Sequence, residues 1–307
     1  MHLLRNLIFI FSSDNMASDE YSLKWFWEHL QSNESTVNFL QNHGIIPKEK
    51  LCQKHHPMTI DYKRSSWRCH KGRCREEVNL RKNTWLEGST LPMNKIIEFI
   101  YAWTKEYTSI KFCRDELGIS HDAVVDYNNY LREVCAHEIL NNPVKIGGPN
   151  CTVEIDETVY AKRKYNKGRM LKEQWVFGGV CKETRDVFLY AVERRDRSTL
   201  ESCIKEIILP GSTIVSDMWK AYEKIEDISG YNFKHLTVNH SENFVDPITG
   251  AHTQQIESTW NLLKRRNKRH CGTKREMMDG YLCEFIWRRR HEGQDLFKVV
   301  LENISKF

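Results

Sequence analysis

The sequence predicts an α/β (α+β) fold whose second half is built on a mixed β-sheet and is preceded by smaller units. Apolar runs from Cys151 onward follow in the order strand, loop, strand, strand, helix and strand. Two of these runs end in an aspartate, Asp156 and Asp217. A later amphipathic helix over residues 252–266 adds a third carboxylate, Glu257. Together these features predict a sheet domain with an acidic site.

The composition is that of an ordinary soluble globular protein, with 40% hydrophobic and 28% charged residues. The net charge of +5 is weak evidence for a nucleic-acid partner. An apolar stretch over residues 7–11 has no convincing cleavage site, so we expect no signal peptide. No run approaches the roughly 18 apolar residues that a membrane span needs. We therefore expect an intracellular protein with reduced cysteines, located in the nucleus if the organism is eukaryotic.

Residues 1–50 form an N-terminal segment for which we expect two short helices, over residues 21–30 and 37–43, and no chemistry.

The next unit, residues 51–86, holds two close pairs of potential zinc ligands: Cys52, His55, Cys69 and Cys74. Such pairs, about a dozen residues apart, are what a tetrahedral structural zinc ion needs. His56 competes with His55 for the fourth position. The alternative is a small β-unit with free cysteines.

Residues 91–142 predict a helix-turn-helix. Pro92 opens a first helix, and helices over residues 109–117 and 120–135 flank Gly118, with Ser120 as the N-cap of the second. The second helix of such a unit can enter the major groove of DNA. Asp122 and Asp126 on that helix oppose close approach to phosphates.

Residues 148–305 predict the sheet domain. The expected strands are 152–156, 175–181, 186–192, 214–217 and 231–238, with helices over 199–208 and most of 218–228. Three successive strands, then a helix and a strand, with an acidic residue at the ends of the first and fourth strands, match a ribonuclease H-like sheet.

Asp156, Asp217 and Glu257 predict a divalent metal site. An aspartate at the end of a buried strand needs a partner, because an unpaired buried charge is expensive, and an all-oxygen ligand set suits Mg²⁺. On the helix, Lys264 returns to the face of Glu257 after two turns, roughly 10 Å away. Glu157 points to the opposite face of the strand and is a weaker ligand candidate. The alternatives are aspartates that cap the next turn and a solvated Glu–Lys pair.

Basic residues flank this acidic trio. Between Lys264 and Arg290 there are ten Lys or Arg against three Asp or Glu, and a second cluster follows Asp156. Basic clusters beside a metal site suit a polyanionic substrate. We expect DNA contacts from Lys162, Arg163, Lys164, Lys167, Arg169, Arg265, Arg266, Lys268 and Arg269.

A series of motifs carries a resemblance to a known family. In order they are Asp156 in Val-Glu-Ile-Asp-Glu-Thr, residues 164–169, 175–179, 216–222, 238–246 and 250–260, and Lys264. Over residues 148–302 the chain resembles the transposases of the Merlin superfamily and their bacterial insertion-sequence relatives. The resemblance implies a ribonuclease H-like catalytic domain with a DDE motif, and a small zinc ribbon near Trp67 and Cys69.

The resemblance also implies the chemistry, a two-metal phosphoryl transfer with two Mg²⁺ (or Mn²⁺) ions per site. Asp156 would bridge both ions, Asp217 would bind one, Glu257 would complete the other, and Lys264 would contact the substrate phosphate. Water would attack at a transposon end, and the freed 3′-hydroxyl would attack target DNA. The implied partners are terminal inverted repeats, target DNA and further copies of the chain in a homodimer or higher oligomer. The alternatives are a host-recruited DNA-binding protein without transposition and a ribonuclease H-like nuclease that does not join strands.

Overall fold

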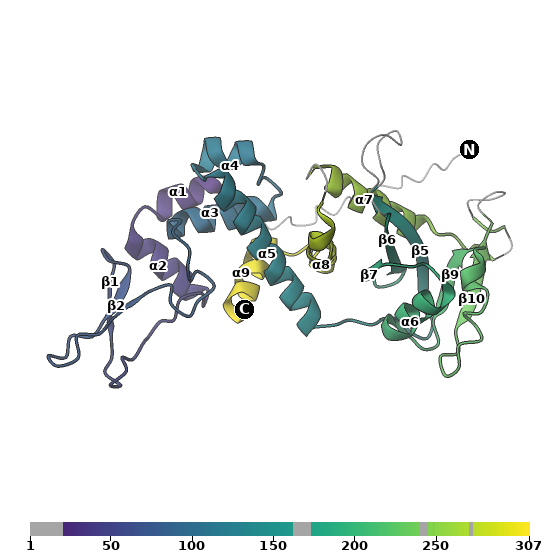
Figure 1. The fold of residues 1–307 in the computed structure, drawn as a ribbon, viewed down its shortest axis with the longest axis horizontal. Coiled ribbons are helices and arrows are strands. Elements are labelled where there is room, and N and C mark those ends of the chain that lie inside the picture. The colour runs from purple at the N-terminus through teal and green to yellow at the C-terminus, as the bar shows by residue number, and fades with distance from the viewer. Residues whose placement is uncertain (1–20, 162–172, 240–244, 248, 270–272) are drawn as a thin grey trace, which may run out of the picture. The chain divides into compact units, whose positions relative to one another are not determined.

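The computed structural model describes residues 21–161, 173–239, 245–247, 249–269 and 273–307. The chain divides into two compact units, Met1–Val124 and Val125–Phe307. The boundary falls within the long helix α5 (His121–Asn141) (Figure 1). In the described part of the chain, no helix combines the length and the apolar character that crossing a membrane requires.

The first unit is organised around the helix α3 (Met93–Thr104), most of which is buried. Helices α1 (Leu23–His29) and α2 (Asn33–Asn42) contact it, and the rings of Phe26 and Tyr101 lie 5.3 Å apart. Ser22 and Ser32 cap α1 and α2 by accepting backbone N–H groups. The two short helices predicted at the start of the chain are confirmed, although α2 begins four residues earlier than expected.

A small antiparallel sheet follows α2 in sequence. It consists of β1 (Thr59–Asp61), β2 (Ser66–Arg68) and β3 (Glu77–Asn79), paired in that order. Trp67 in β2 is buried, and Arg68 pairs with Asp61 at 3.1 Å. Short strands around one tryptophan bury little apolar surface, so a unit of this size gains from a metal cross-link.

The helices around Gly118 end and begin as predicted. Helix α4 (Ile110–Leu117) is capped by Ser109, and Gly118 ends it in the left-handed region at φ 66°. The Ser120 hydroxyl accepts the backbone N–H of Ala123 at the start of α5. Helix α5 continues to Asn141, beyond the predicted end at residue 135.

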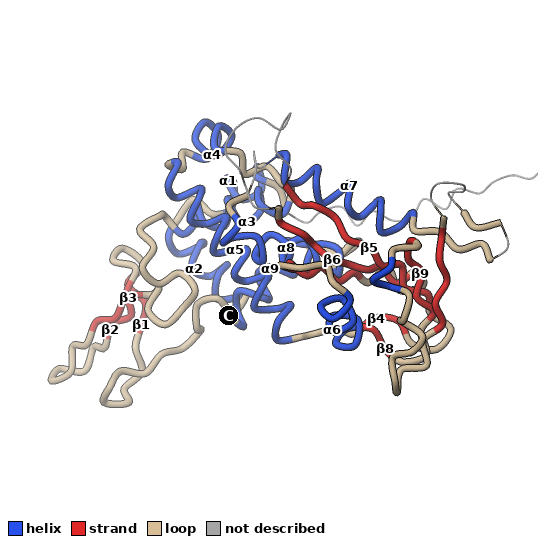
Figure 2. The backbone as a smooth tube through the Cα atoms, turned by 45° about the vertical axis from the view of Figure 1, so that its right-hand side comes forward, coloured by secondary structure: helices blue, strands red, loops and turns tan. Residues whose placement is uncertain are grey.

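The second unit contains a five-stranded mixed sheet in the order β10-β9-β5-β6-β7. Strands β5 (Thr152–Ala161), β6 (Gln174–Cys181) and β7 (Val187–Val192) are antiparallel, whereas β9 (Thr213–Asp217) and β10 (Lys234–Val238) run parallel to β5. Three antiparallel strands followed by two that run parallel to β5 form the predicted ribonuclease H-like sheet. Figure 2 draws its strands in red. The short strands β4 (Ile146–Gly147) and β8 (Ile208–Leu209) pair with each other.

Helices cover both faces of this sheet. Val153 and Ile155 of β5 belong to a core that includes Leu200 and Ile204 of α6 (Arg197–Ile207). Tyr160 belongs to a second core on the opposite face, with α7 (Gln254–Arg269) and α8 (Met278–Arg290). Helix α9 (Leu296–Lys306) closes the chain. Alternate residues of β5 therefore face different helices, as the period of a strand requires.

Two expectations about the elements were wrong. Strand β5 does not end at Asp156 but runs to Ala161, because its antiparallel ladder with β6 continues to the pair of Ala161 with Gln174. Residues 218–228 are not largely helical and contain only the short 3₁₀ helix η2 (Lys220–Tyr222). Their apolar residues recur every three positions, and successive i→i+3 backbone bonds place them in the α6-side core: Trp219, Tyr222, Ile225 and Ile228.

Candidate active site

Asp156 and Asp217 lie on one face of neighbouring strands. The parallel ladder between β5 and β9 pairs Glu154 with Val215, and the two aspartates each lie two residues beyond that pair. Side chains two apart along a strand share a face. Val215 packs with Ala251 just before α7, and Tyr160 packs against α7 and α8, so both aspartates face α7. Asp156 thus lies just beyond the end of the ladder with β9, although it is in the middle of its own strand.

Glu154 fixes the start of α7 against β5. Its side chain is fully buried, and its Oε2 accepts the backbone N–H groups of Gln255 at 2.8 Å and Ile256 at 3.1 Å. On its other oxygen, Lys182 Nζ lies 3.6 Å away and His252 Nδ1 3.2 Å away. A carboxylate at a helix N-terminus satisfies free N–H groups and interacts favourably with the helix dipole. The anchor sits immediately before Glu257 and therefore sets its position.

The anchoring role of Glu154 is not among the sequence predictions. Glu154 shares the strand face of Asp156, so the alternation of β5 placed it beside α7. That signal identifies the face but not the backbone groups that Glu154 contacts.

His252 makes a structural hydrogen bond, since Lys182 Nζ donates to its Nε2 at 3.0 Å.

Trp260 links α7 to the first aspartate. Its ring N–H donates to Asp156 Oδ2 at 2.8 Å. Gly178 of β6 pairs with Asp156 across the ladder, and a Cβ at Gly178 would lie 2.6 Å from the Trp260 ring. Real Cβ contacts are essentially never that short, so glycine at position 178 lets the indole lie against the sheet.

Negative charge gathers around Asp156. Burial raises the pKa of Asp156 to about 6; the Trp260 hydrogen bond opposes this shift, and the charges of Asp217 and Glu257 add to it. On the opposite face of β5, burial raises the pKa of Glu157 to about 7, and Asp156 and Asp217 contribute. Glu157 accepts a hydrogen bond from the Tyr222 hydroxyl and pairs with Arg195 at 3.6 Å. Glu157 thus has protein partners of its own.

The three predicted carboxylates are near one another without being tightly clustered. Glu257 is exposed in the first turn of α7, where the Thr253 hydroxyl donates to it at 3.1 Å. All three residues are described in the structure, and their carboxylate oxygens do not all lie within 4.8 Å of one another. The donor set still fits a hard cation such as Mg²⁺, because it is all oxygen and its repulsion would be relieved by positive charge.

The predicted basic residues fall into three groups. Lys264 is half-buried in α7, one turn beyond Trp260, and Arg265, Lys268 and Arg269 are exposed near the end of the same helix. Lys162, Arg163, Lys164, Lys167 and Arg169 lie outside the described residues. Arg266 differs from the expectation, since it donates to the buried carboxylate of Glu284 at 2.7 Å. Its position on the inner side of α7 explains why it binds protein instead of facing solvent.

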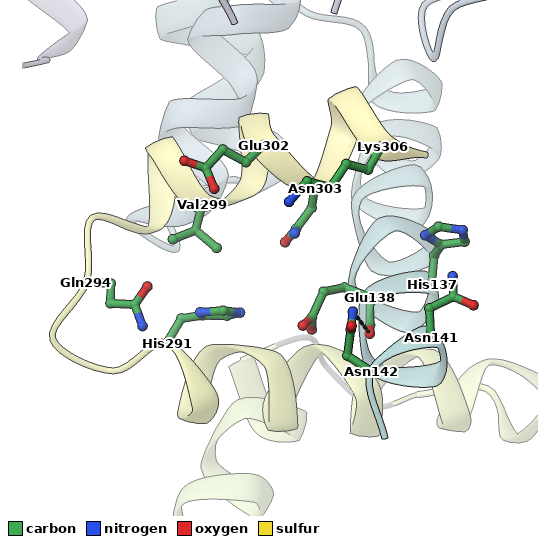
Figure 3. A pocket seen from close by; sticks show the side chains of 10 residues that line it. All are labelled: His137, Glu138, Asn141, Asn142, His291, Gln294, Val299, Glu302, Asn303 and Lys306. Carbon is green, nitrogen blue, oxygen red and sulfur yellow. Dashed lines mark hydrogen bonds between the residues drawn. The ribbon is translucent and has the colours of Figure 1, made fainter. Parts of the chain in front are cut away.

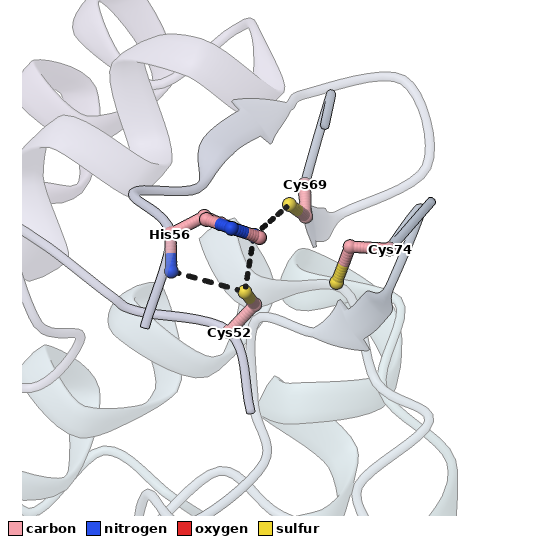
Figure 4. A group of neighbouring side chains, drawn as sticks. All are labelled: Cys52, His56, Cys69 and Cys74. Carbon is pink, nitrogen blue, oxygen red and sulfur yellow. Dashed lines mark hydrogen bonds between the residues drawn. The ribbon is translucent and has the colours of Figure 1, made fainter. Parts of the chain in front are cut away.

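Four side chains in the first unit converge in the arrangement of a zinc site: Cys52, His56, Cys69 and Cys74 (Figure 4). His56 Nδ1 lies 3.4 Å from Cys52 Sγ and 3.7 Å from Cys69 Sγ. Nitrogen and sulfur ligands of one tetrahedral zinc are roughly 3.6 Å apart, given the usual bond lengths. The spacing therefore fits Zn²⁺.

The predicted ligand His55 is replaced by His56 in this group. His55 has φ 58°, and its N–H donates to the Cys52 carbonyl at 2.8 Å, which closes a tight turn. The turn brings the His56 backbone N–H to 3.2 Å from Cys52 Sγ and directs the His56 ring to the thiols. Burial acts to raise the pKa of Cys52, but backbone hydrogen bonds from His56 and Lys54 outweigh it and lower the pKa, which favours the thiolate that binds metal.

A polar cavity of about 430 Å³ lies among α5, α9 and the turn after α8. Figure 3 shows the His291 ring directed into it toward Glu138. Neither ring nitrogen of His291 has a hydrogen-bond partner within the described part of the chain. None of the sequence-predicted site residues lines this cavity.

The fold and the site together define a ribonuclease H-like domain with a carboxylate site on its central strand. Residues 145–290 match the family model of the ISXO2-like transposase domain. Over these residues the chain thus resembles an insertion-sequence-related transposase domain, and this part of the predicted resemblance is confirmed.

Individual proteins are similar to the chain as well. An uncharacterized transposase-like protein of Haemophilus influenzae is 29% identical over 102 residues, which cover 33% of this chain and 79% of that protein. The male abnormal protein mab-31 of Caenorhabditis elegans is 24% identical over 233 residues, covering 66% of this chain and 53% of the worm protein, so the chain spans about half the length of that relative. Among solved structures, the integrase catalytic core domain of HTLV-2 in complex with magnesium is similar, with 16% identity, a TM-score of 0.30, and coverage of 46% of this chain and 84% of that one.

Proposed function

We propose that the protein is a DDE-type DNA transposase that cuts and joins DNA strands in a metal-dependent reaction. The observation that carries the proposal is the placement of Asp156 and Asp217 on the sheet face that packs against α7, the helix that contains Glu257. In keeping with this, burial raises the pKa of Asp156, and the charges of Asp217 and Glu257 add to the shift. Residues far apart in the chain thus direct acidic groups to one face of a ribonuclease H-like sheet. The match to a transposase domain over residues 145–290 supports the same function.

Asp156, Asp217 and Glu257 are the proposed ligands for two Mg²⁺ or Mn²⁺ ions. When bound, such ions activate the attacking oxygen and stabilise the leaving oxygen at a phosphodiester. Trp260 orients Asp156 through its ring N–H, and Glu154 holds the start of α7. Lys264 would contact the phosphate beside the site, while Arg265, Lys268 and Arg269 offer exposed positive charge for the DNA backbone.

The proposed partners are transposon terminal inverted repeats, target DNA and at least a second copy of the chain. We further propose a Merlin-type protein with four parts: an N-terminal helical segment (1–50), a zinc ribbon (51–86), a helix-turn-helix that contacts DNA (91–142) and the catalytic domain (148–305). The Cys52, His56, Cys69 and Cys74 group supports zinc in the second part. Helices α4 and α5 around Gly118 support the third.

The test is DNA cleavage and joining by the full chain with terminal-repeat DNA and Mg²⁺ or Mn²⁺. We expect the parent protein to do both and Asp217→Asn to lose at least about 100-fold in cleavage, since even outer-shell changes at metal sites cost up to that much. Asp227→Asn is the matched control, because it makes the same change at an exposed aspartate of the same unit and should cleave like the parent. If Asp217→Asn cleaved as well as the parent, the assignment of the metal ligands would be wrong.

A second candidate is a host-recruited DNA-binding protein that no longer transposes. Two observations favour it: the Caenorhabditis elegans relative is named a male abnormal protein and not a transposase, and the oxygens of the three carboxylates are not all within 4.8 Å of one another. The same assay separates the candidates. Cleavage with joining supports the transposase, cleavage alone supports a nuclease, and a shift in DNA mobility without either supports the recruited protein.

A further inference from the structure

A second group of metal-ligating side chains lies where β5 begins. Cys151 immediately precedes β5, Cys181 is the last residue of β6, and Glu183 lies in the turn between β6 and β7. One ligand atom from each, two thiol sulfurs and a carboxylate oxygen, all lie within 4.8 Å of one another. Cys181 Sγ is 3.4 Å from Glu183 Oε2. Sulfur and oxygen ligands of one tetrahedral zinc are roughly 3.6 Å apart, so this pair already has that spacing.

Backbone hydrogen bonds fix the positions from which these ligands project. The Cys151 carbonyl accepts the Thr213 N–H at 2.9 Å, and the Cys181 N–H donates to the Asp186 carbonyl at 2.9 Å to close the hairpin. The Thr152 N–H donates to Glu183 Oε2 at 2.8 Å, which holds the carboxylate beside the thiols. A site formed by rigid strands and a tight turn needs little rearrangement to bind an ion.

The group has both a buried and an accessible side. Cys181 is fully buried, Cys151 is half-buried and Glu183 is exposed. An ion can therefore enter from the side of Glu183, where water can complete its coordination. Five residues of extended chain separate Cys151 from Asp156, which corresponds to roughly 17 Å, so this group is separate from the acidic site.

We propose that Cys151, Cys181 and Glu183 bind a thiophilic divalent cation, Zn²⁺ by its ligand preference, with water in the fourth position. Two thiolates and a carboxylate suit zinc, whereas Mg²⁺ prefers oxygen ligands alone. Binding releases the two thiol protons to solvent and involves no redox step. The ion would tie the start of β5 to the β6–β7 turn and so stabilise this end of the sheet. The inference does not depend on the proposed DNA chemistry.

The experiment counts zinc on the full chain by native mass spectrometry and follows Cd²⁺ binding by thiolate-to-metal charge-transfer absorption. Carboxylate sites do not give that absorption, so the acidic trio does not interfere. We expect Cys151→Ala to bind one ion fewer than the parent. Glu183→Gln should weaken one class of Cd²⁺ sites by at least about tenfold, the lower end of what even an outer-shell change costs. Cys203→Ala is the matched control, since Cys203 is a half-buried thiol of α6 outside the group, and it should match the parent.

Circular dichroism checks that each variant folds, and Glu183→Gln decides the question if Cys151→Ala does not fold, because Glu183 is exposed. The proposal is overturned if Cys151→Ala or Glu183→Gln, while folded, binds as many ions as tightly as the parent. A thiol titration that finds Cys151 and Cys181 joined as a disulfide in protein purified under reducing conditions would overturn it too.

Discussion

Trp260 contacts Asp156 through the only polar atom of its side chain, and it does so from the same helix that carries Glu257 and Lys264. The indole N–H donates to the carboxylate at 2.8 Å and opposes the rise in the Asp156 pKa that burial causes. The ring fits because residue 178 lacks a Cβ. One tryptophan thus both packs α7 on the sheet and favours the ionised form of Asp156 that a cation needs.

Trp260→Phe should therefore weaken the site without unfolding the domain. Phenylalanine keeps the apolar contact but loses a hydrogen bond to a charged group, worth about 1.5–3 kcal/mol. We expect DNA cleavage to require about tenfold more Mg²⁺ or to fall by about tenfold, measured in Mg²⁺ titrations of cleavage rate. Trp287→Phe is the control, since the N–H of Trp287 donates to Asn303 in the helical part of the unit. Equal Mg²⁺ dependence in both variants would contradict the role of Trp260.

At the scale of elements, α7 is held at its first turn by Glu154 rather than only by its apolar face. The contacts to Gln255 and Ile256 join residues about a hundred positions apart in sequence. A buried carboxylate with two N–H donors and two cationic or polar neighbours fixes both the position and the rotation of the helix. Glu257, which follows directly, is placed by that anchor.

Glu154→Gln should lower the free energy of unfolding by about 2 kcal/mol, because hydrogen bonds to a charged group are replaced by neutral ones. Chemical denaturation measures this loss. We expect DNA cleavage to fall as well, since α7 then lacks its anchor. Glu201→Gln, which removes only the partly exposed pair with Lys205 in α6, should leave both quantities near those of the parent. An unchanged stability in Glu154→Gln would rule out the anchoring role.

The turn after Cys52 decides which histidine faces the thiols. We expect His56→Asn to lose the zinc of the first unit and His55→Asn to keep it, measured as zinc content and as competition with a chelator. Asparagine tolerates the left-handed backbone of residue 55, so the pair is matched in chemistry and strain. If only His55→Asn lost zinc, His55 would be the ligand, as the sequence predicted, and His56 would not.

At the scale of the second unit, a buried cluster joins three helices. Glu284 of α8 is fully buried and accepts hydrogen bonds from Arg266 of α7 at 2.7 Å and from Arg288 at 2.9 Å. Burial acts to raise its pKa, but the charges of Arg266, Arg288 and Arg132 of α5 outweigh it and lower the pKa to about 2.

This pKa shift predicts the response of stability to acid. The folded pKa of about 2 lies below the ordinary value of 4.5, so the contribution of Glu284 is complete above about pH 4.5 and is lost as the pH falls toward 2. We expect the free energy of unfolding to fall over that window in the parent. In Glu284→Gln this pH dependence should be shallower, with stability about 3 kcal/mol lower at neutral pH because two half-buried guanidinium groups lose their charged partner. Urea unfolding at a series of pH values measures both, and an equal slope in parent and variant would refute the assignment.

Hydrophobic periodicity predicted the five strands and the helix that carries Glu257, because burial of one face imposes a period of 2 or 3.6 on the sequence. With Gly118 as the turn and Ser120 as the N-cap, it also predicted the helix pair around Gly118. Side-chain type and spacing added the candidate metal ligands of the acidic trio and of the Cys/His group. Periodicity predicted the wrong structure over residues 218–228, because the apolar residues there recur at every third position and pack through successive 3₁₀-type turns instead of an α-helix.

The sequence by itself determined the class of fold, the candidate acidic residues and the chemistry of the candidate zinc ligands, since these follow from local pattern and side-chain type. Only the tertiary structure decided that Glu154 anchors α7, that His56 rather than His55 faces the thiols, and that Arg266 binds Glu284 instead of facing solvent. Each of these depends on which backbone or charged group from a separate element meets a side chain. A periodic pattern specifies the face of an element, but the partner on that face is fixed only when the elements pack.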